Sequence, residues 1–316
     1  MTTALVFPGQ GSQAPGMGKD IFDNFTSAKE VFQEIDDALN QKLSKLIFEG
    51  SSAELDLTEN TQPALMAVSL SIMKVLENDF NFKFDNKINC VAGHSLGEYS
   101  ALTAAKTFTI SDCAKLLRTR GKAMQQAAPV GVGAMAAIIG LEYEDVEKVT
   151  TQASTPNIWC SVANDNCPGQ IVISGHSEAV LKAMEIAKEH GARKTLQLAV
   201  SAPFHCALMA PAANIMKDAL ENTQMNRPIK PLIANVTAEA IDSPETIKTQ
   251  LIEQITGRVR WRESVLTMEN MEVTKIYEIG AGKVLSGLIK RTAPSIECVA
   301  INTISDVEQI AKELQR

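Results

Sequence analysis

The sequence predicts an α/β fold in which helices cover a mostly parallel sheet, with a smaller domain inserted into it. Short apolar segments alternate with amphipathic ones in residues 1–128 and again in residues 201–316, which favours parallel strands joined by helices. Residues 129–200 instead read strand, helix, strand, strand, helix, strand, the order of a ferredoxin-like βαββαβ unit. We therefore expect a larger domain from residues 1–128 and 201–316, and an inserted ferredoxin-like domain from residues 129–200.

The chain begins with a strand and a glycine-rich loop. Residues 4–7 are apolar and short enough for a buried strand, and residues 9–14 then fit the dinucleotide-binding pattern G-x-G-x-x-A. That pattern also requires a helix directly after the loop. Pro15 and the glycines beside it interrupt such a helix, and helical spacing resumes only around residues 29–35. Dinucleotide binding is therefore kept as an alternative outside catalysis.

Two further helices are expected in the first part of the chain. Residues 60–63 open one of them with Pro63 near its first position, where a missing N–H is tolerated, and apolar residues then recur at helical spacing as far as Leu76. Ser111 is expected to cap the next helix, over residues 112–126.

A strand-turn-helix pattern surrounds Ser95. Residues 88–92 have the apolar composition of a buried strand, and residues 98–105 that of a helix with Glu98 in its first turn. Residues 93–97 fit G-x-S-x-G, a sharp turn that exposes the serine hydroxyl beside free helix N–H groups. We interpret Ser95 as a nucleophile; the alternative is a glycine-flanked turn in which Ser95 only caps the helix.

Alternating strand and helix patterns continue to the end of the chain. In the insertion we expect strands over 134–139, 158–163, 170–174 and 194–200, and helices over 143–152 and 177–189. Residues 164–169 are rich in Asn, Asp, Pro and Gly, which favours a turn. After the insertion we expect helices over 209–220, 247–255 and 284–291, and strands over 231–236 and from Tyr277.

A serine nucleophile needs a base, and the sequence offers four histidines. His205 follows the last strand of the insertion, where loop residues meet the active face of an α/β sheet. His94 should point away from its neighbour Ser95, and His190 lies at a helix end beside Gly191, where it caps the helix. His176 lies in a loop between a strand and a helix, where either role is open. We interpret His205 as the base, with a structural role as the alternative. No acid stands out as its partner, although a carbonyl can also accept the second N–H of the ring.

Arg120 lies on the apolar face of its predicted helix. At about 100° per residue it shares an arc with Cys113, Leu116, Leu117 and Met124, whereas the other basic residues of the helix lie opposite. A buried guanidinium needs an anion, because its charge is otherwise poorly compensated. Arg120 therefore binds either a substrate carboxylate in bidentate fashion or an internal carboxylate in a structural ion pair.

The composition is that of an ordinary globular protein. A formal net charge of −7 argues against broad nucleic-acid binding. No apolar run approaches membrane-spanning length, and the first residues lack the basic leader of a signal peptide. The six cysteines form no C-x-x-C pair, which indicates reduced core thiols in a cytoplasmic protein rather than a disulfide framework or a metal site.

Taken together, these segments resemble the malonyl-CoA:acyl carrier protein transacylases, the acyltransferases that load malonyl units in fatty-acid synthesis. The resemblance spans nearly the whole chain. It rests on FPGQGSQ at 7–13, TQPA at 61–64, GHSLGE at 93–98, RG at 120–121, PGQ at 168–170, HC at 205–206 and GAGKVL at 280–285. Several motifs in the right order are more specific than any one of them.

The resemblance implies a two-step acyl transfer. Ser95 would carry the acyl group and His205 would act as general acid and base. Backbone N–H groups of Gln10 and Leu96 would form the oxyanion hole. Malonyl-CoA and acyl carrier protein would be the partners, without nucleic acid, membrane, metal or redox cofactor.

The resemblance also implies three supporting roles and a fold. Arg120 would hold the malonyl carboxylate, the carbonyl of Gln254 would orient His205, and Asn164 would line the substrate pocket. The family fold is an α/β-hydrolase-like core with a mostly parallel sheet and an inserted ferredoxin-like subdomain, in agreement with the order of elements above.

Two positions depart from the family's pattern. The family often has Asn-Pro where this chain has Gly257 and Arg258, close to Gln254. Phe204 stands where a small residue often precedes the histidine, and its bulk should narrow the pocket against branched acyl groups.

A serine esterase or thioesterase with the same turn is the alternative within catalysis, since the sequence does not show how water is excluded.

Overall fold

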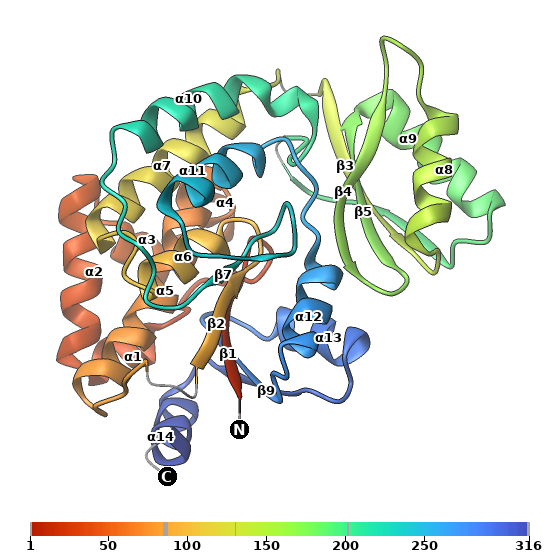
Figure 1. Cartoon of the computed structure of the whole chain (residues 1–316). Helices are drawn as coiled ribbons and strands as arrows, with labels where there is room; N and C mark the ends of the chain where they lie inside the picture. Colours follow the sequence, from red (N-terminus) through yellow and green to blue (C-terminus); the bar gives the residue numbers. More distant parts are fainter. Residues whose placement is uncertain (1, 85–87, 130, 201, 315–316) are drawn as a thin grey trace.

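The computed structural model of the chain describes residues 2–84, 88–129, 131–200 and 202–314. It is a mixed α/β structure with two sheets (Figure 1). The larger sheet contains β1 (Thr3–Phe7), β2 (Ile88–Gly93), β7 (Leu232–Ile233), β8 (Ala240–Ile241), β9 (Lys275–Ile279) and β10 (Glu297–Ile301). The smaller sheet contains β3 (Gly133–Ile139), β4 (Cys160–Cys167), β5 (Gln170–His176) and β6 (Lys194–Gln197).

Helices surround the larger sheet, and two more cover the smaller one (Figure 1). The first group is α1 (Lys19–Asn24), α2 (Thr26–Leu39), α3 (Leu43–Glu49), α4 (Ser52–Leu55), α5 (Thr58–Asn78), α6 (Gly97–Ala104), α7 (Ile110–Gln126), α10 (Ala210–Glu221), α11 (Pro244–Glu253), α12 (Trp261–Asn270), α13 (Val284–Thr292) and α14 (Ile304–Leu314). The second group is α8 (Tyr143–Ala153) and α9 (Ser177–Glu189).

The larger sheet has the strand order β10-β9-β1-β2-β7-β8. Every neighbouring pair is parallel except β7 and β8. All five residues of β1 are buried, as expected for a central strand with apolar contacts on both faces. The predicted α/β class with a mostly parallel sheet is confirmed.

The smaller sheet is antiparallel, with the order β4-β5-β3-β6. It is built from residues 133–197, whose elements follow the predicted sequence of strand, helix, strand, strand, helix, strand. The predicted domain ends at residues 1, 201 and 316 lie outside the described residues, and the boundaries between the two domains stay a prediction.

A segment that follows α11 joins the two sheets. Val259 forms a parallel bridge with Asn164: its N–H donates to the Ala163 carbonyl at 2.8 Å, and its carbonyl accepts from the Asp165 N–H at 2.9 Å. Arg262 in α12 also pairs with the buried Asp165 carboxylate at 2.9 Å. The smaller sheet is therefore attached to the segment that begins at Gln254, the residue that ends α11.

The predicted turn at residues 164–169 is wrong for its first four residues. Asn164–Cys167 belongs to β4, and only Pro168 and Gly169 form the turn to β5. Pairing with β5, with two register irregularities, overrides the local turn preference of Asn and Asp. The last strand of the insertion ends at Gln197 rather than at residue 200, and β7 keeps only two residues of the strand predicted over 231–236.

Two predicted helix starts are also wrong. Helix α5 begins at Thr58, so Pro63 lies inside the helix, because the Leu57 carbonyl already accepts N–H groups from Asn60 and Thr61. Helix α7 is capped by Thr109, whose hydroxyl accepts the N–H of Asp112 at 3.0 Å. The expected cap, Ser111, donates its hydroxyl to Glu34 instead.

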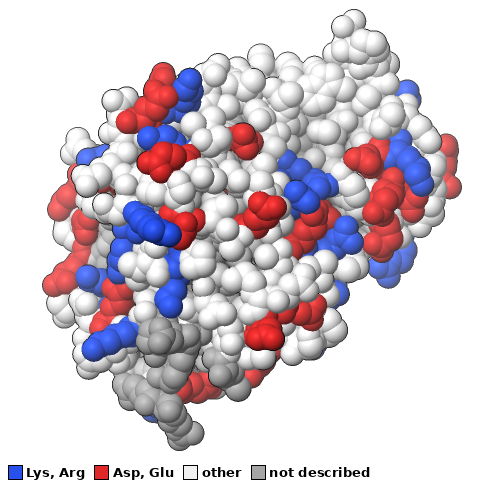
Figure 2. All heavy atoms as spheres, viewed as in Figure 1, with Lys and Arg blue, Asp and Glu red and all other residues white. Residues whose placement is uncertain are grey.

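The surface and the thiols carry less information about function. On the face in Figure 2, acidic and basic side chains are interspersed. All six cysteines are free, and all but Cys298 are buried, as the sequence predicted for core thiols. Among the described residues, no helix has both the length and the apolar composition needed to cross a bilayer.

Candidate active site

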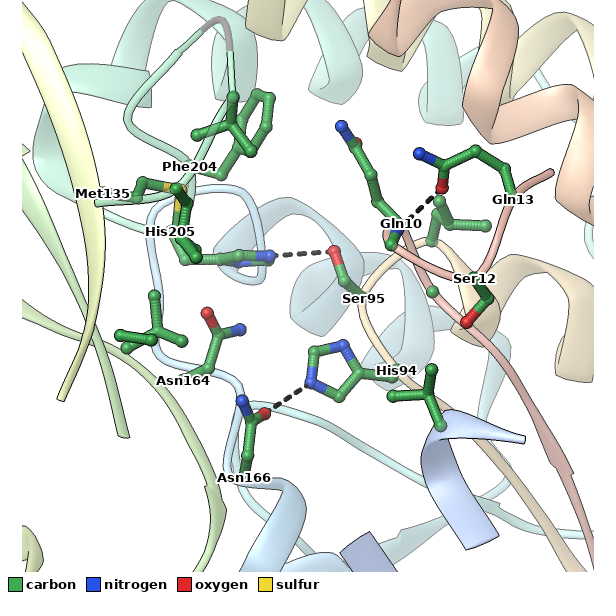
Figure 3. Close-up of a pocket in the computed structure, with 18 of the residues that line it drawn as sticks. Gln10, Ser12, Gln13, His94, Ser95, Met135, Asn164, Asn166, Phe204 and His205 are labelled. Carbon is green, nitrogen blue, oxygen red and sulfur yellow. Dashed lines mark hydrogen bonds between the residues drawn. The ribbon is translucent and has the colours of Figure 1, made fainter. Parts of the chain in front are cut away.

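A cavity of about 410 Å³ lies between the larger sheet and the smaller one. The segments around the larger sheet contribute Gln10, Ser95, Leu96, Arg120 and His205 to its wall, and the smaller sheet contributes Met135, Asn164, Asn166 and Val172. Figure 3 shows Ser95 at the centre, with His205 on one side and Gln10 on the other. A cavity of this size suits a small acyl group with part of its carrier.

The predicted strand-turn-helix around Ser95 is confirmed, with β2 before the serine and α6 after it. Ser95 has φ 53°, a left-handed conformation that is rare outside glycine. A Cβ at Gly93 would lie 1.9 Å from the carbonyl carbon of Gly97, so the strand and the helix could not approach this closely with any other residue there. Leu96 is the N-cap of α6 and no side chain caps that helix, so the capping alternative for Ser95 is wrong.

His205 forms a hydrogen-bonded chain with Ser95 and Gln254. Its Nε2 lies 2.8 Å from Ser95 Oγ, and its Nδ1 lies 2.8 Å from the main-chain carbonyl oxygen of Gln254. The carbonyl can only accept, so the ring proton lies on Nδ1 and Nε2 is left to accept the serine proton. Among the residues that the structure describes, no carboxylate takes part in these hydrogen bonds.

The surroundings keep His205 neutral. The ring is buried, and burial together with the positive charge of Arg120 lowers its pKa to about 3. The hydrogen bond to Gln254 opposes this shift without cancelling it. At neutral pH the imidazole is therefore an unprotonated base.

Arg120 is almost completely buried and points at the nucleophile. Its Nη2 donates to Ser95 Oγ at 3.0 Å and to Gln254 Oε1 at 2.8 Å, and its Nη1 donates to Gln62 Oε1 at 2.8 Å. Its Nε has no acceptor among the described residues. All its hydrogen-bond partners are neutral, so the structural ion pair offered as the alternative is absent from the part of the chain that the structure describes.

Gln10 and Leu96 both lie at the cavity beside Ser95. The loop after β1 reaches this position because Gly9 has no side chain: a Cβ there would lie 2.5 Å from the carbonyl oxygen of His94. Within the described residues, neither the Gln10 N–H nor the Leu96 N–H donates to a protein acceptor. Both are therefore free to bind an oxygen in the cavity.

The remaining predicted residues lie on the wall opposite Gln10. Asn164 lines the cavity from β4, and Phe204 and Met135 line it as well (Figure 3). His94 turns to Asn166, with 2.8 Å between its Nε2 and the amide oxygen, as expected for a residue that points away from Ser95.

Three further residues at the site were not predicted as such. Asn235 accepts the N–H of Ser95 through its side chain at 2.7 Å, Glu98 lies beneath the turn, and Gln62 holds Arg120. Gln62 and Glu98 belong to the motifs TQPA and GHSLGE, so the resemblance could have indicated that they are part of the site. Asn235 follows an apolar segment and has no such signal.

The glycine-rich loop at residues 9–14 does not form a dinucleotide site. The pattern needs a helix directly after the loop, where N–H groups bind the phosphates. The next helix, α1, begins only at Lys19, and the loop packs against the Ser95 turn instead.

The fold and this site define an acyl-transferring serine enzyme, and comparison with known proteins gives the family. A family model described as an acyl transferase domain matches residues 4–312. The chain therefore belongs to the acyl transferase domain family.

Its relatives narrow this class. The chain is 44% identical to a malonyl CoA-acyl carrier protein transacylase of Bacillus subtilis, covering 99% of this chain and 96% of the relative. It is similar to the crystal structure of an acyl-carrier-protein-S-malonyltransferase from Bartonella henselae, with TM-score 0.97, 49% identity and 100% of both chains covered. It also resembles a malonyl-transacylase solved in complex with a type II PKS acyl-carrier protein, with TM-score 0.95, 38% identity, and 99% and 100% covered.

Proposed function

We propose that this chain transfers a malonyl group from malonyl-CoA to the phosphopantetheine thiol of an acyl carrier protein, through a malonyl ester on Ser95. The names of its relatives describe this activity. The observation that carries the proposal is Arg120, a buried guanidinium 3.0 Å from the Ser95 hydroxyl whose hydrogen-bond partners are all neutral. A substrate that ends in a carboxylate would supply the missing anion.

The first half-reaction forms the ester. His205 Nε2 takes the Ser95 proton as Oγ attacks the thioester carbonyl. The developing oxyanion would be bound by the N–H groups of Gln10 and Leu96. The carbon–sulfur bond then breaks, and the coenzyme A sulfur takes the proton from the His205 imidazolium as it leaves, so that His205 is neutral again.

The second half-reaction repeats these steps in reverse. The carrier protein's thiol gives its proton to His205 and attacks the malonyl ester, and Ser95 leaves as it recovers a proton from the imidazolium. The Gln254 carbonyl, 2.8 Å from Nδ1, would keep the ring oriented throughout. These steps need no metal and no redox cofactor.

Arg120 would select the acyl group. Its unpaired Nε–H and the two Nη groups offer several donors to a carboxylate beside Ser95. Burial lowers the pKa of Arg120, but a guanidinium stays charged at neutral pH, so the anion remains required. Asn164 would complete the substrate pocket from the smaller sheet.

We infer the finer architecture in the same way. Residues 1–128 and 201–316 would form an α/β-hydrolase-like domain, which fits a nucleophile at the turn after a parallel strand. Residues 129–200 would form a ferredoxin-like domain, which fits the antiparallel order β4-β5-β3-β6. A cytoplasmic location and a place in fatty-acid synthesis would follow from the substrates.

Intact mass after mixing with malonyl-CoA tests the proposal. One added malonyl group is expected, and acyl carrier protein should remove it while becoming malonylated. Release of free malonate at the same rate with and without carrier protein would indicate a thioesterase instead.

A further inference from the structure

A network of buried amides surrounds Ser95, and Glu98 lies at its base. Glu98 is 2% exposed; its Oε1 accepts the main-chain N–H of Asn235 at 2.6 Å, and its Oε2 accepts the side-chain N–H of Gln254. Both oxygens therefore face donors. A protonated oxygen would turn its own O–H toward an N–H group, so this geometry suits the carboxylate form.

The two residues that Glu98 contacts hold the main chain of the nucleophile. Asn235 Oδ1 accepts the Ser95 N–H at 2.7 Å, and Gln254 Nε2 donates to the Ser95 carbonyl at 2.9 Å. Asn235 also donates its Nδ2–H to the Gly93 carbonyl at 2.7 Å. The left-handed conformation of Ser95 is thus fixed at both of its peptide groups, as a strained residue requires.

Glu98, together with the Ser95 carbonyl, also determines which end of the Gln254 amide faces Arg120. A carboxylate only accepts hydrogen bonds, so it turns the amide NH₂ toward itself and the amide oxygen away. That oxygen accepts from Arg120 Nη2 at 2.8 Å. A reversed amide would present NH₂ to the guanidinium, donor against donor.

We propose that Glu98 is a positioning residue for the acyl transfer described above. Its two acceptor oxygens fix Asn235 and Gln254, and through them the Ser95 main chain and the direction of the Arg120 guanidinium. Glu98 itself touches neither the substrate nor the reacting oxygen. The inference rests on the proposed function for its effect on malonyl transfer, but not for its effect on Ser95.

The variant Glu98→Gln isolates this role, because it keeps the shape and replaces one acceptor by an NH₂ donor. Either Asn235 or Gln254 then faces a donor. We expect kcat with malonyl-CoA to fall roughly ten- to a hundred-fold, the range for a lost hydrogen bond to a charged group. KM for malonyl-CoA should rise while KM for acetyl-CoA stays, since only malonyl uses Arg120.

Asp36→Asn is the matched control. Asp36 is also a buried carboxylate, and its two oxygens accept the N–H and the hydroxyl of Ser44 at 2.9 and 2.6 Å. It belongs to α2 and does not line the cavity. We expect a lower melting temperature and an unchanged preference between malonyl-CoA and acetyl-CoA.

A second readout needs no malonyl group. The rate at which a neutral fluorophosphonate labels Ser95 reports the serine and its base, and Glu98→Gln should slow it. If wild type is labelled but transfers no malonyl, the proposed function fails, and the labelling rates still test Glu98.

Two results would overturn the inference. One is a Glu98→Gln protein with wild-type labelling and wild-type preference for malonyl-CoA. The other is a loss equal for both acyl groups that follows melting temperature, as for Asp36→Asn. If Glu98→Gln does not fold, Glu98→Asp takes its place, because it keeps the charge but is one methylene shorter and cannot reach both donors. We expect the same slower labelling and weaker preference for malonyl-CoA, and the same two results would overturn the inference.

Discussion

The two sheets contribute to the cavity in different ways. Beside the larger sheet, hydrogen bonds hold the nucleophile and its base in place: Asn235 and Gln254 hold the Ser95 main chain, and His205 bonds to Gln254. The smaller sheet contributes a wall of apolar side chains such as Met135 and Val172, with amides at its edge. We therefore expect the residues around Ser95 to determine the rate of acyl transfer, and the wall from the smaller sheet to determine which shapes of acyl group fit.

The largest effect is expected at the nucleophile. Ser95→Ala should abolish the malonyl adduct and lower turnover by about 10³–10⁶, the range for a lost catalytic nucleophile. Intact mass and a coupled transfer assay measure both. A malonylated cysteine, or unchanged turnover in Ser95→Ala, would show that Ser95 is not the nucleophile and that the larger sheet does not carry the reacting group.

The base should come next. His205→Ala is expected to slow acylation about 10²–10⁴-fold, the usual share of general acid–base catalysis. Since a carbonyl rather than a carboxylate accepts its Nδ1 proton, no substitution of a single Asp or Glu should match this loss. A scan of the acidic residues by single-turnover acylation checks the expectation, and one equally slow variant would reveal a hidden triad.

Arg120 connects rate with specificity. Arg120→Ala should lower kcat/KM for malonyl-CoA roughly ten- to a hundred-fold and keep or raise acetyl transfer, because only malonyl offers a carboxylate. Arg118→Ala is the control, since Arg118 lies on the same helix as Arg120, donates to Asn60 and Gln41 and does not line the cavity. Equal losses for both acyl groups would make Arg120 structural.

The pH profile tests how strongly the larger domain encloses its base. Burial lowers the pKa of His205 to about 3, so the ring stays neutral and active as pH falls through 6.5, its ordinary value. We expect kcat/KM for malonyl-CoA to show no acid limb near 6.5. Burial raises the pKa of Glu98, and the hydrogen bonds from Asn235 and Gln254 oppose that rise. Because both of its oxygens face donors, we assign Glu98 the carboxylate form at neutral pH.

The measurement is kcat/KM over the pH range in which circular dichroism shows the folded protein. The pKa of His205 is about 3 in the folded protein and about 6.5 in the unfolded chain, so between these pH values only the unfolded chain is protonated at this residue. The free energy of unfolding therefore also falls as pH drops from 6.5 toward 3. An inflection of kcat/KM near 6.5 in fully folded protein would show that water reaches the base.

The smallest effect on malonyl transfer is expected on the wall beside the smaller sheet. Phe204→Ala should change malonyl transfer by less than about tenfold and improve branched acyl groups by about ten- to two-hundred-fold, since a pocket discriminates weakly between methylene-sized differences. Competition between malonyl-CoA and methylmalonyl-CoA gives the ratio. Leu196→Ala, on an exposed position of β6, is the control. A rate loss as large as that of Arg120→Ala would contradict the division between the two sheets.

Local sequence patterns were sufficient to predict the Ser95 turn. They failed where the structure of a residue depends on contacts with segments far away in the sequence. The strand, the glycines and the helix around Ser95 are adjacent in sequence, so their spacing predicted them. Asn235 lies 140 positions away and reaches Ser95 only through the pairing of β2 with β7. The strand at Asn164 was read as a turn because its pairing with β5, and its bridge to Val259 95 positions later, leave no trace in its own residues.

The resemblance predicted more than the residues alone did. It implied the Gln254 carbonyl as the partner of His205, a main-chain atom that no side-chain pattern reveals, and the structure has the two in contact. Glu98 was expected only as an acid suited to a helix N-terminus. Its burial beneath the turn depends on Asn235 and Gln254, which come from two other segments.

The left-handed conformation of both reacting residues has an evolutionary consequence. Ser95 and His205 have φ 53° and φ 58°, a region that opposes a side chain by about 1–2 kcal/mol per residue and that glycine enters freely. Glycine would relieve this strain at either position while removing the chemistry. In a lineage that no longer needed acyl transfer, we expect drift to place glycine at these two positions first, in a chain that still folds.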